Sequence, residues 1–366
     1  MPLLPRVFTL VIAVILLFVP PLATAGTPEP APVTAAELKI FQLKHQDVIA
    51  IAFETCLRTA SVPDPLTFKL EPKFHVNQQN GLITITAAAQ PALPELNGQT
   101  CFVQTISSIR LQQLTVQAPT PGQLTLTVAY NSRTAKPRIT TVKRKRVNQP
   151  DNTTVYRTYL VLKFAGIQAG SPPKTIVIDP GHGGNDLGAA SNYLYEKELN
   201  LDIALLSCDI FRQHGYDVYM TRTSDTRPGL LDRADAANIL EADAFISIHN
   251  NSMPDNMPAP ARKLYRGTTV LYNAAAPKPA KELAAIMADE LSGALRIHQY
   301  PLQDRPGLVV LNSTWVPAVL AEVAMMPHPQ DAKMISQRVY RLEAAQAIVQ
   351  ATEKYFKIAA LATGRH

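Results

Sequence analysis

The feature that most constrains the fold is a change of hydrophobic pattern across a short segment rich in glycine, serine and proline, residues 166–173. Before this segment, apolar residues mostly alternate with polar ones over short runs, which is typical of β-strands. After it, short apolar runs alternate with longer ones that have helical spacing. We therefore expect a smaller β-rich or α+β domain over residues 38–165, a linker over 166–173, an α/β domain over 174–357 and a tail over 358–366.

The C-terminal half predicts a sheet covered by helices on both faces. Its clearest helix, residues 198–214, places Leu199, Ile203, Leu206 and Ile210 on one side and ends before Gly215. Further strands are expected at residues 175–178, 216–220, 244–249, 268–272, 308–311 and 318–322. Further helices are expected at residues 231–240, 281–295 and 332–356, the last with Ile335, Val339 and Leu342 turned inward.

The N-terminal half predicts mostly strands. Asn80-Gly81 is a hairpin turn signal between two of them. Strands are expected at residues 38–43, 68–76, 82–86, 108–116, 124–130, 138–146 and 155–164, and a short helix is expected at residues 46–58.

The first 25 residues are typical of an export signal. Arg6 precedes an apolar run over residues 7–19, and the small residues Ala23 to Ala25 form a cleavage site. The alternative is an uncleaved membrane anchor. We expect cleavage after Ala25, a flexible lead-in over residues 26–37, and an exported protein in the periplasm or cell wall.

The net charge of the chain excludes few classes of binding partner. Arg6 is the only charge in the signal, so removing the signal lowers the formal charge from +6 to +5. This mild excess suits an anionic envelope polymer and gives no reason to expect nucleic acid. The basic run at residues 143–146 fits either an edge strand whose cations prevent aggregation or an envelope-binding patch.

Three cysteines allow one bridge. Cys56 and Cys101 could pair in an oxidising compartment, whereas Cys208 lies in a periodic helix and is expected to be a buried thiol. Spacing alone does not decide the pairing.

Four residues that can bind a metal or transfer a proton fall at the ends of predicted elements: His182, Glu196, His249 and Glu322. His182 lies in the glycine-rich turn IDPGHGG, residues 178–184, and Glu196 precedes a helix. Each has an ordinary structural explanation by itself. Together, two histidines and a glutamate form a common ligand set for catalytic zinc, and a spare carboxylate supplies the base for a zinc-bound water.

The order and surroundings of these residues resemble the zinc-dependent N-acetylmuramoyl-L-alanine amidases of the type-3 catalytic domain family. The resemblance runs from Lys174 to about Phe356. It includes the segments IDPGHGG at 178–184, EKE at 196–198, TR at 221–222, ADAFISIHNN at 242–251 and PAVLAE at 317–322.

The resemblance implies that His182, Glu196 and His249 bind Zn²⁺ and that Glu322 is the catalytic glutamate. The implied reaction is hydrolysis of the amide bond between N-acetylmuramic acid and L-alanine in peptidoglycan. Asp179 and Asn251 are expected either to orient the histidines or to make local turn bonds.

The sequence departs from the family after Glu322. The family usually continues with an apolar residue, Gly, Phe and a Ser-Asn pair, whereas this chain has VAMMPH at residues 323–328. We expect altered packing and substrate contacts there rather than lost activity. We interpret His328 as a loop residue and not as a ligand.

Two other functions remain open. One is a catalytically silent peptidoglycan-binding or regulatory protein with the amidase fold, and the other is a zinc hydrolase acting on a soluble metabolite. The N-terminal domain is the expected place for an anionic envelope polymer or a protein activator to bind.

Overall fold

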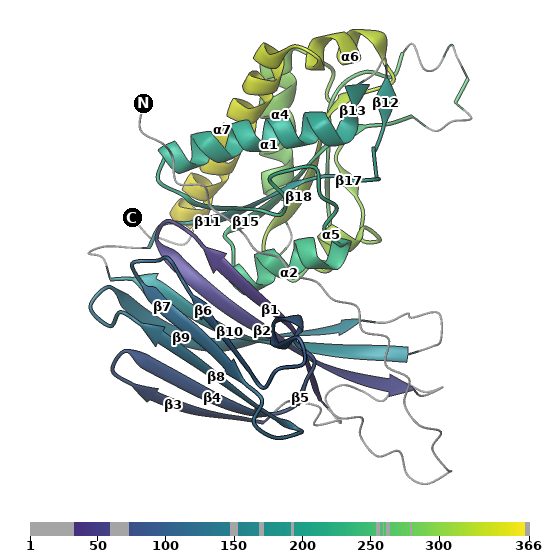
Figure 1. Cartoon of the computed structure of the whole chain (residues 1–366). Coiled ribbons are helices and arrows are strands. Elements are labelled where there is room, and N and C mark those ends of the chain that lie inside the picture. The colour runs from purple at the N-terminus through teal and green to yellow at the C-terminus, as the bar shows by residue number, and fades with distance from the viewer. Residues whose placement is uncertain are drawn as a thin grey trace. The chain divides into compact units, whose positions relative to one another are not determined.

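The computed structural model describes residues 33–58, 73–146, 153–167, 172–191, 194–253, 257–258, 260, 264–278 and 280–362 (Figure 1). The predicted export signal and most of the predicted lead-in lie outside the described residues. The chain divides between Pro172 and Pro173 into two compact units. The finer domain boundaries remain predictions. Among the described residues, no helix has the length and apolar character needed to cross a membrane.

The first unit consists of two five-stranded sheets, which confirms its β-rich character. One sheet has the order β5-β1-β2-β10-β9, with β1 Thr34–Gln42, β2 Gln46–Arg58, β5 Gln90–Pro91, β9 Ala135–Arg146 and β10 Thr153–Gly166. The other has the order β3-β4-β8-β7-β6, with β3 Phe74–Gln79, β4 Leu82–Ala88, β6 Cys101–Thr105, β7 Leu111–Gln117 and β8 Gln123–Tyr130. A 3₁₀ turn, η1, covers Pro94–Leu96. Both sheets contribute to one core, in which Ile49 and Ile51 lie with Leu114 and Val128.

The helix predicted at residues 46–58 is wrong, because this segment is strand β2, paired with β1 and β10 on its two sides. Ile49 and Ile51 enter the shared core, while Val48 and Ala50, on the opposite face, are also fully buried. Burial on both faces removes the alternation of polar and apolar residues that marks a strand. Strand β6 was not predicted.

The cysteine and the basic run of the first unit can be compared with the expectations from the sequence. Cys101 is a free, exposed thiol, so it forms no disulfide with Cys56 in this structure. The Cys56 side chain lies outside the described residues. The basic run at residues 143–146 ends β9, which is the edge strand of its sheet, as the edge-strand interpretation requires.

The second unit is a six-stranded sheet of order β14-β11-β15-β18-β16-β17. Strands β14, β11, β15 and β18 are mutually parallel, and β16 runs antiparallel to β18. The strands are β11 Thr175–Pro180, β14 Asp217–Met220, β15 Ala244–Asn251, β16 Thr269–Tyr272, β17 Gln303–Asp304 and β18 Ala318–Met325. A small hairpin, β12 Ala190–Ser191 and β13 Leu194–Tyr195, stands apart from this sheet.

Helices cover both faces of this sheet, as the sequence predicts (Figure 1). Helices α1, α4 and α7 lie on one face, with α7 packed against the other two, while α2 and α5 pack together on the opposite face. The helices are α1 Glu196–Gln213, α2 Leu230–Leu240, α4 Lys281–Leu295, α5 Val309–Asn312, α6 Pro329–Ile335 and α7 Arg338–Ala362.

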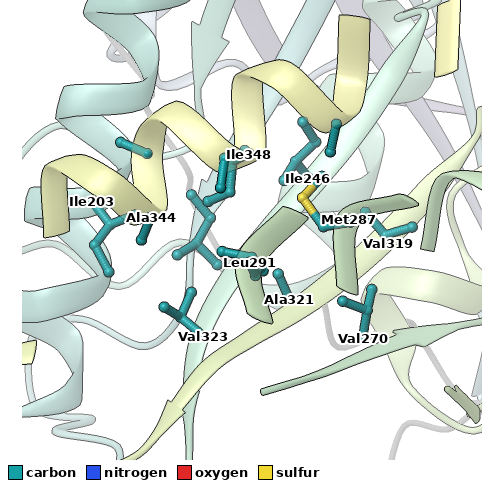
Figure 2. Packing of buried hydrophobic residues seen from close by; sticks show 14 of the residues in the cluster. Ile203, Ile246, Val270, Met287, Leu291, Val319, Ala321, Val323, Ala344 and Ile348 are labelled. Atoms are coloured by element: carbon teal, nitrogen blue, oxygen red, sulfur yellow. The ribbon is translucent and has the colours of Figure 1, made fainter. Parts of the chain in front are cut away.

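The core of the second unit lies between the sheet and the helices α1, α4 and α7. Ile203 of α1, Leu291 of α4 and Ile348 of α7, labelled in Figure 2, belong to one buried cluster with strand residues such as Val319. Cys208 of α1 is buried in this cluster, which confirms the expected buried thiol, and burial raises its pKa to about 11. This core holds the ends of the parallel strands in fixed positions.

Two predicted elements of this unit are wrong. The strand predicted at residues 308–311 is the short helix α5, and the single helix predicted at residues 332–356 is two helices, α6 and α7. The break is stabilised by Arg341, whose Nη1 donates hydrogen bonds to the Ile335 and Ser336 carbonyl oxygens at 2.8 and 2.7 Å. These bonds satisfy carbonyl groups at the end of α6. Because α7 has its own orientation, Val339 is 54% exposed instead of turned inward.

Candidate metal centre

The four residues singled out in the sequence come together at one edge of the second unit's sheet. Parallel strands end at a shared edge, which is where sites are built in open α/β sheets. His182 follows β11 by two residues, His249 lies in β15, and Glu322 of β18 is the register partner of His249. Glu196 is the first residue of α1.

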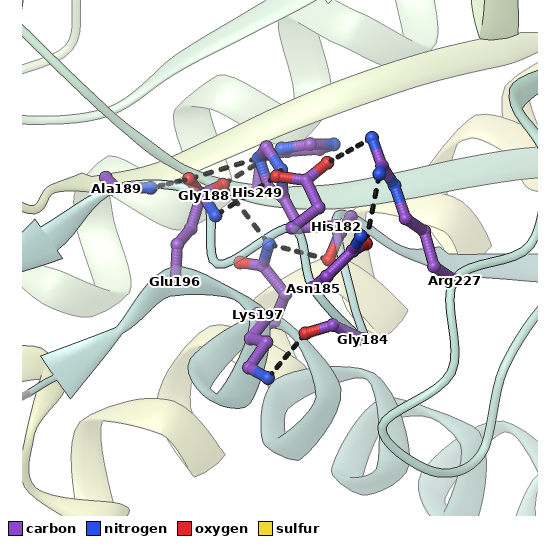
Figure 3. Close-up of polar contacts among 12 residues, drawn as sticks. His182, Gly184, Asn185, Gly188, Ala189, Glu196, Lys197, Arg227 and His249 are labelled. Atoms are coloured by element: carbon purple, nitrogen blue, oxygen red, sulfur yellow. Dashed lines mark hydrogen bonds and ion pairs between the residues drawn. The ribbon is translucent and has the colours of Figure 1, made fainter.

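His182, Glu196 and His249 point their donor atoms at one another (Figure 3). All three donor atoms lie within 4.8 Å of one another. His182 Nε2 lies 3.2 Å from Glu196 Oε2, and His249 Nδ1 lies 2.9 Å from Glu196 Oε1. The set has the composition of a three-ligand zinc site. It could hold a metal ion.

The Glu196 carboxylate is buried and held from several sides. Its Oε1 accepts hydrogen bonds from Asn250 N at 3.1 Å and Asn200 Nδ2 at 3.2 Å, and its Oε2 accepts one from Ala189 N at 2.8 Å. Burial by itself would raise the pKa of Glu196, but hydrogen bonds from His182 and His249 outweigh burial and hold that pKa well below its ordinary value. The carboxylate is therefore ionised and ready to bind a cation.

Glycines make this close approach possible. A Cβ at Gly188 would lie 2.5 Å from Glu196 Oε2 and 2.7 Å from His182 Cδ2, and a Cβ at Gly181 would lie 2.2 Å from His249 Nε2. Gly188 also has a φ of 66°, and His182 itself has a φ of 60°. A non-glycine residue in this region is strained, which is common at functional sites.

Buried cations hold the loop that carries His182. Arg222 donates hydrogen bonds to the carbonyl oxygens of Pro180 and Gly181 at 3.0 and 2.8 Å. Arg233 donates to the carbonyl oxygens of Pro180 and His182 at 2.7 and 2.8 Å. These hydrogen bonds occupy the carbonyl oxygens of three successive residues, so the backbone of the loop is fixed.

Among the described residues, no hydrogen bond joins Asp179 or Asn251 to His182 or His249. Asp179 is buried and accepts hydrogen bonds from Arg233 Nη1 at 2.7 Å and from the hydroxyl groups of Thr221 and Ser247. Asn251 Oδ1 accepts a bond from Ser252 N at 2.8 Å, which is the local turn bond of the alternative interpretation. Asp179 therefore acts on the loop through Arg233.

The residue that does face a ligand is Asp186, which the sequence reasoning missed. Its Oδ1 lies 2.9 Å from His182 Nδ1, the ring nitrogen turned away from Glu196. Burial would lower the pKa of His182, but hydrogen bonds to Glu196 and Asp186 raise it overall. A position four residues after His182 is not by itself a sequence signal, because the contact depends on the left-handed backbone of His182.

Arg227 supports Asp186 from outside. Its Nη2 lies 3.5 Å from Asp186 Oδ2, and its Nη1 donates a hydrogen bond to Asn185 Oδ1 at 3.0 Å (Figure 3). Asn200 and Asn250, which the sequence reasoning also missed, meet behind Glu196, where Asn250 Nδ2 donates to Asn200 Oδ1 at 2.9 Å.

Glu322 lies beside the cluster without joining it. Its Oε2 is buried and has no hydrogen-bond partner among the described residues. Burial raises the pKa of Glu322 to about 7, with His249 opposing the rise and Glu196 adding to it. A carboxyl group with this pKa can both accept and release a proton near neutral pH.

The segment that departs from the family pattern after Glu322 is well packed. Strand β18 continues to Met325, whose N donates a hydrogen bond to the buried Asp331 at 3.3 Å. His328 is buried and immediately precedes α6, which agrees with its interpretation as a loop residue.

Comparisons with known proteins identify relatives of the C-terminal half of this chain. The model of the N-acetylmuramoyl-L-alanine amidase family matches residues 176–354. Half of the chain is 35% identical to N-acetylmuramoyl-L-alanine amidase LytC of Bacillus subtilis, and half is 36% identical to the probable cell wall amidase LytH of Staphylococcus saprophyticus. The chain spans 36% of the first relative and 58% of the second.

Among solved structures, the chain is similar to the N-acetylmuramoyl-L-alanine amidase from Clostridium difficile 630, with 32% identity and a TM-score of 0.47. That match covers 51% of this chain and 98% of the other. By the family model and these curated relatives, the C-terminal half of the chain belongs to the N-acetylmuramoyl-L-alanine amidase family.

Proposed function

We propose that the protein hydrolyses the amide bond between N-acetylmuramic acid and L-alanine in peptidoglycan, with Zn²⁺ as its cofactor. The observation that carries the proposal is the convergence of His182, Glu196 and His249 beside the unpartnered carboxylate of Glu322. Family membership supports the reaction class.

The residues fit a zinc ion. Two imidazole nitrogens and an ionised carboxylate are the donor types that catalytic zinc uses, and three protein ligands leave one position for water or substrate. When bound, zinc supplies a Lewis acid that polarises a carbonyl group and lowers the pKa of water.

The protein side chains prepare the ligands for this role. The Asp186 carboxylate faces His182 Nδ1, which leaves Nε2 of that ring free for a metal. His249 presents its Nδ1 instead, because its Nε2 side lies against Gly181. Asn200 and Asn250 hold the orientation of Glu196.

Glu322 moves the proton. As the general base, it takes a proton from the attacking water, and it then delivers that proton to the departing nitrogen of L-alanine. In the metal-free site burial raises its pKa, so this carboxyl group holds a proton more tightly than an exposed glutamate does. Because Glu322 Oε2 makes no hydrogen bond among the described residues, it is available to the water.

The remaining assignments from the sequence belong to the same proposal. We assign export to residues 1–25 with cleavage after Ala25, and a location in the periplasm or cell wall, where peptidoglycan is available. We assign catalysis to residues 174–357, and the binding of an anionic envelope polymer or a protein activator to the N-terminal domain.

Digestion of purified sacculi tests the proposal. The zinc-loaded protein should release stem peptides with a free N-terminal L-alanine, detected by mass spectrometry. Glu322→Ala should abolish release while zinc remains bound. Glu198→Ala is the matched control, because Glu198 lies on the exposed side of α1, two residues from Glu196.

Each alternative gives a different result. A silent binding protein would sediment with sacculi and release nothing. A hydrolase for soluble metabolites would neither sediment with sacculi nor release peptides. Full activity of Glu322→Ala would refute the role given to that carboxylate.

A further inference from the structure

A group of three aromatic rings lies outside the metal centre, and the proposed mechanism does not use it. Tyr265 and Tyr300 stack with ring centroids 5.2 Å apart and an interplanar angle of 9°. His298 meets the Tyr300 ring edge-on, with centroids 4.6 Å apart. We call these three residues the aromatic platform.

The platform is open to solvent. Tyr265 is 45% exposed, and the preceding residue, Leu264, is 78% exposed. Because one face of the Tyr265 ring lies on Tyr300, the exposed surface of this side chain comes from its other face and its edges. Leu264 and Tyr265 therefore present neighbouring apolar surface to solvent.

The platform lies at the same edge of the sheet as the metal centre. Thr269 of β16 is the register partner of Glu322, and because β16 is antiparallel to β18, the residues before Thr269 extend beyond Glu322 at the catalytic edge. Tyr265 is four residues before Thr269, a span of at most ~14 Å.

Thr268 connects the platform to the strand of Glu322. Its hydroxyl group donates a hydrogen bond to the Glu322 carbonyl oxygen at 2.8 Å, and its own carbonyl oxygen accepts one from Tyr300 N at 2.8 Å. These two bonds join the backbone beside the platform to the strand that carries Glu322.

Buried contacts hold the platform in place before any ligand binds. The fully buried Asp331 accepts hydrogen bonds from Arg266 Nε at 3.0 Å and Gly267 N at 2.8 Å. Gly267 packs so closely that a Cβ there would lie 2.1 Å from the His298 carbonyl oxygen. Such preorganisation lowers the entropy lost on binding.

We propose that the aromatic platform is a subsite for a pyranose ring of the glycan strand, next to the sugar whose amide is cleaved. One face of a pyranose presents C–H groups, which are attracted to the electron-rich face of an aromatic ring. Such a ligand needs no charge, and the neighbouring cation, Arg266, is already paired with Asp331. The acidic stem peptide offers neither a flat ring nor a match to this uncharged surface.

This subsite rests on the proposed function, and kinetics on two substrates tests it. One substrate is sacculus fragments with long glycan strands, and the other is a single N-acetylmuramoyl peptide without neighbouring sugars. Tyr265→Ala should raise KM for the fragments about tenfold, leave kcat unchanged, and leave KM for the single-sugar substrate unchanged. Tyr265→Phe should behave as wild type, since it keeps the ring.

Val339→Ala is the control, because it removes an exposed apolar side chain from α7 instead of the platform. An equal KM change on both substrates, or no change on either, would overturn the subsite. A change that follows the length of the stem peptide would also overturn it, because the platform would then hold the peptide.

Titration with the N-acetylglucosamine tetramer separates this subsite from the proposed function. In one outcome the wild type binds the tetramer, Tyr265→Ala does not, and the wild type hydrolyses no peptidoglycan. This outcome would refute the amidase function and support the platform. Hydrolysis with an unchanged KM in Tyr265→Ala and no tetramer binding would support the amidase function and refute the platform.

Discussion

Among single residues, Glu322 shows how a strand position determines chemistry. It is the register partner of His249, so the two side chains are neighbours, yet nothing among the described residues donates a hydrogen bond to its Oε2. Burial without a partner disfavours the ionised form of a carboxyl group. The burial of Glu322 without a partner therefore explains its raised pKa, and it predicts that the stability of the protein depends on pH.

Glu322 should destabilise the metal-free protein as pH rises. The carboxyl group ionises near pH 4.5 in the unfolded chain and near pH 7 in the folded protein. Between these values the folded state binds more protons, so the free energy of unfolding falls as pH rises and levels off above pH 7. Relative to Glu322→Gln, the wild type should lose about 3 kcal/mol between pH 4 and pH 8.

Urea denaturation of the metal-free proteins at both pH values measures this difference. Glu198→Gln changes an exposed glutamate, so its free energy of unfolding should follow that of the wild type at both pH values. A constant difference between wild type and Glu322→Gln at all pH values would contradict the burial of this charge.

Asp186 should strengthen zinc binding through His182. Asp186→Asn keeps the size of the side chain but removes the charge 2.9 Å from His182 Nδ1, so zinc affinity should fall about 10- to 100-fold. Competition with a chromophoric chelator measures the affinity. Asp225→Asn is the control, because Asp225 accepts hydrogen bonds from Gly184 N, in the same loop as Asp186, and from Lys197 Nζ of α1. Among the described residues, it makes no hydrogen bond or ion pair with His182, Glu196 or His249. Equal losses of zinc affinity in both variants would show that Asp186 only helps the loop to fold.

The sequence pointed to the residues that the structure brings together as a possible metal site, but not to the residues that support them. His182, His249 and Glu322 were identifiable because parallel strands end at one edge. Asp186 was not, because its contact depends on the left-handed backbone of His182 and on the paired hydrogen bonds between Gly183 and Asp186. Such turn geometry leaves no periodic pattern.

At the scale of elements, the turn between β11 and α1 determines whether the ligands can meet. Gly188→Ala would place a methyl group against Glu196 and His182 and also strain a positive φ. We expect this variant to lose zinc binding, measured as bound zinc after dialysis.

Gly293→Ala provides the matched control for this turn. Gly293 lies in α4 with nothing within 4 Å of an added Cβ, so alanine should preserve zinc binding and stabilise the helix by about 0.5–1 kcal/mol. Normal zinc content in Gly188→Ala would show that the turn tolerates a side chain.

Periodicity predicted most elements of the second unit and failed for identifiable reasons. Helix α5 has only four residues, too few to show helical spacing. The break between α6 and α7 contains no proline or glycine and depends on the Arg341 contacts, which come from the tertiary fold. Strand β2 was mistaken for a helix because it is buried on both faces.

At the scale of the whole molecule, each unit has a hydrophobic core of its own. A chain consisting of Pro173–His366 should therefore fold without the first unit and retain zinc. Circular dichroism during heating should show one cooperative transition. A truncated chain without cooperative unfolding would show that the second unit depends on the first.

The central claim is that His182, Glu196 and His249 jointly hold one zinc ion. Native mass spectrometry of the wild type and of the three single alanine variants tests it most directly. We expect one bound zinc per wild-type chain and little or none in each variant. Full zinc occupancy in all three variants would contradict it.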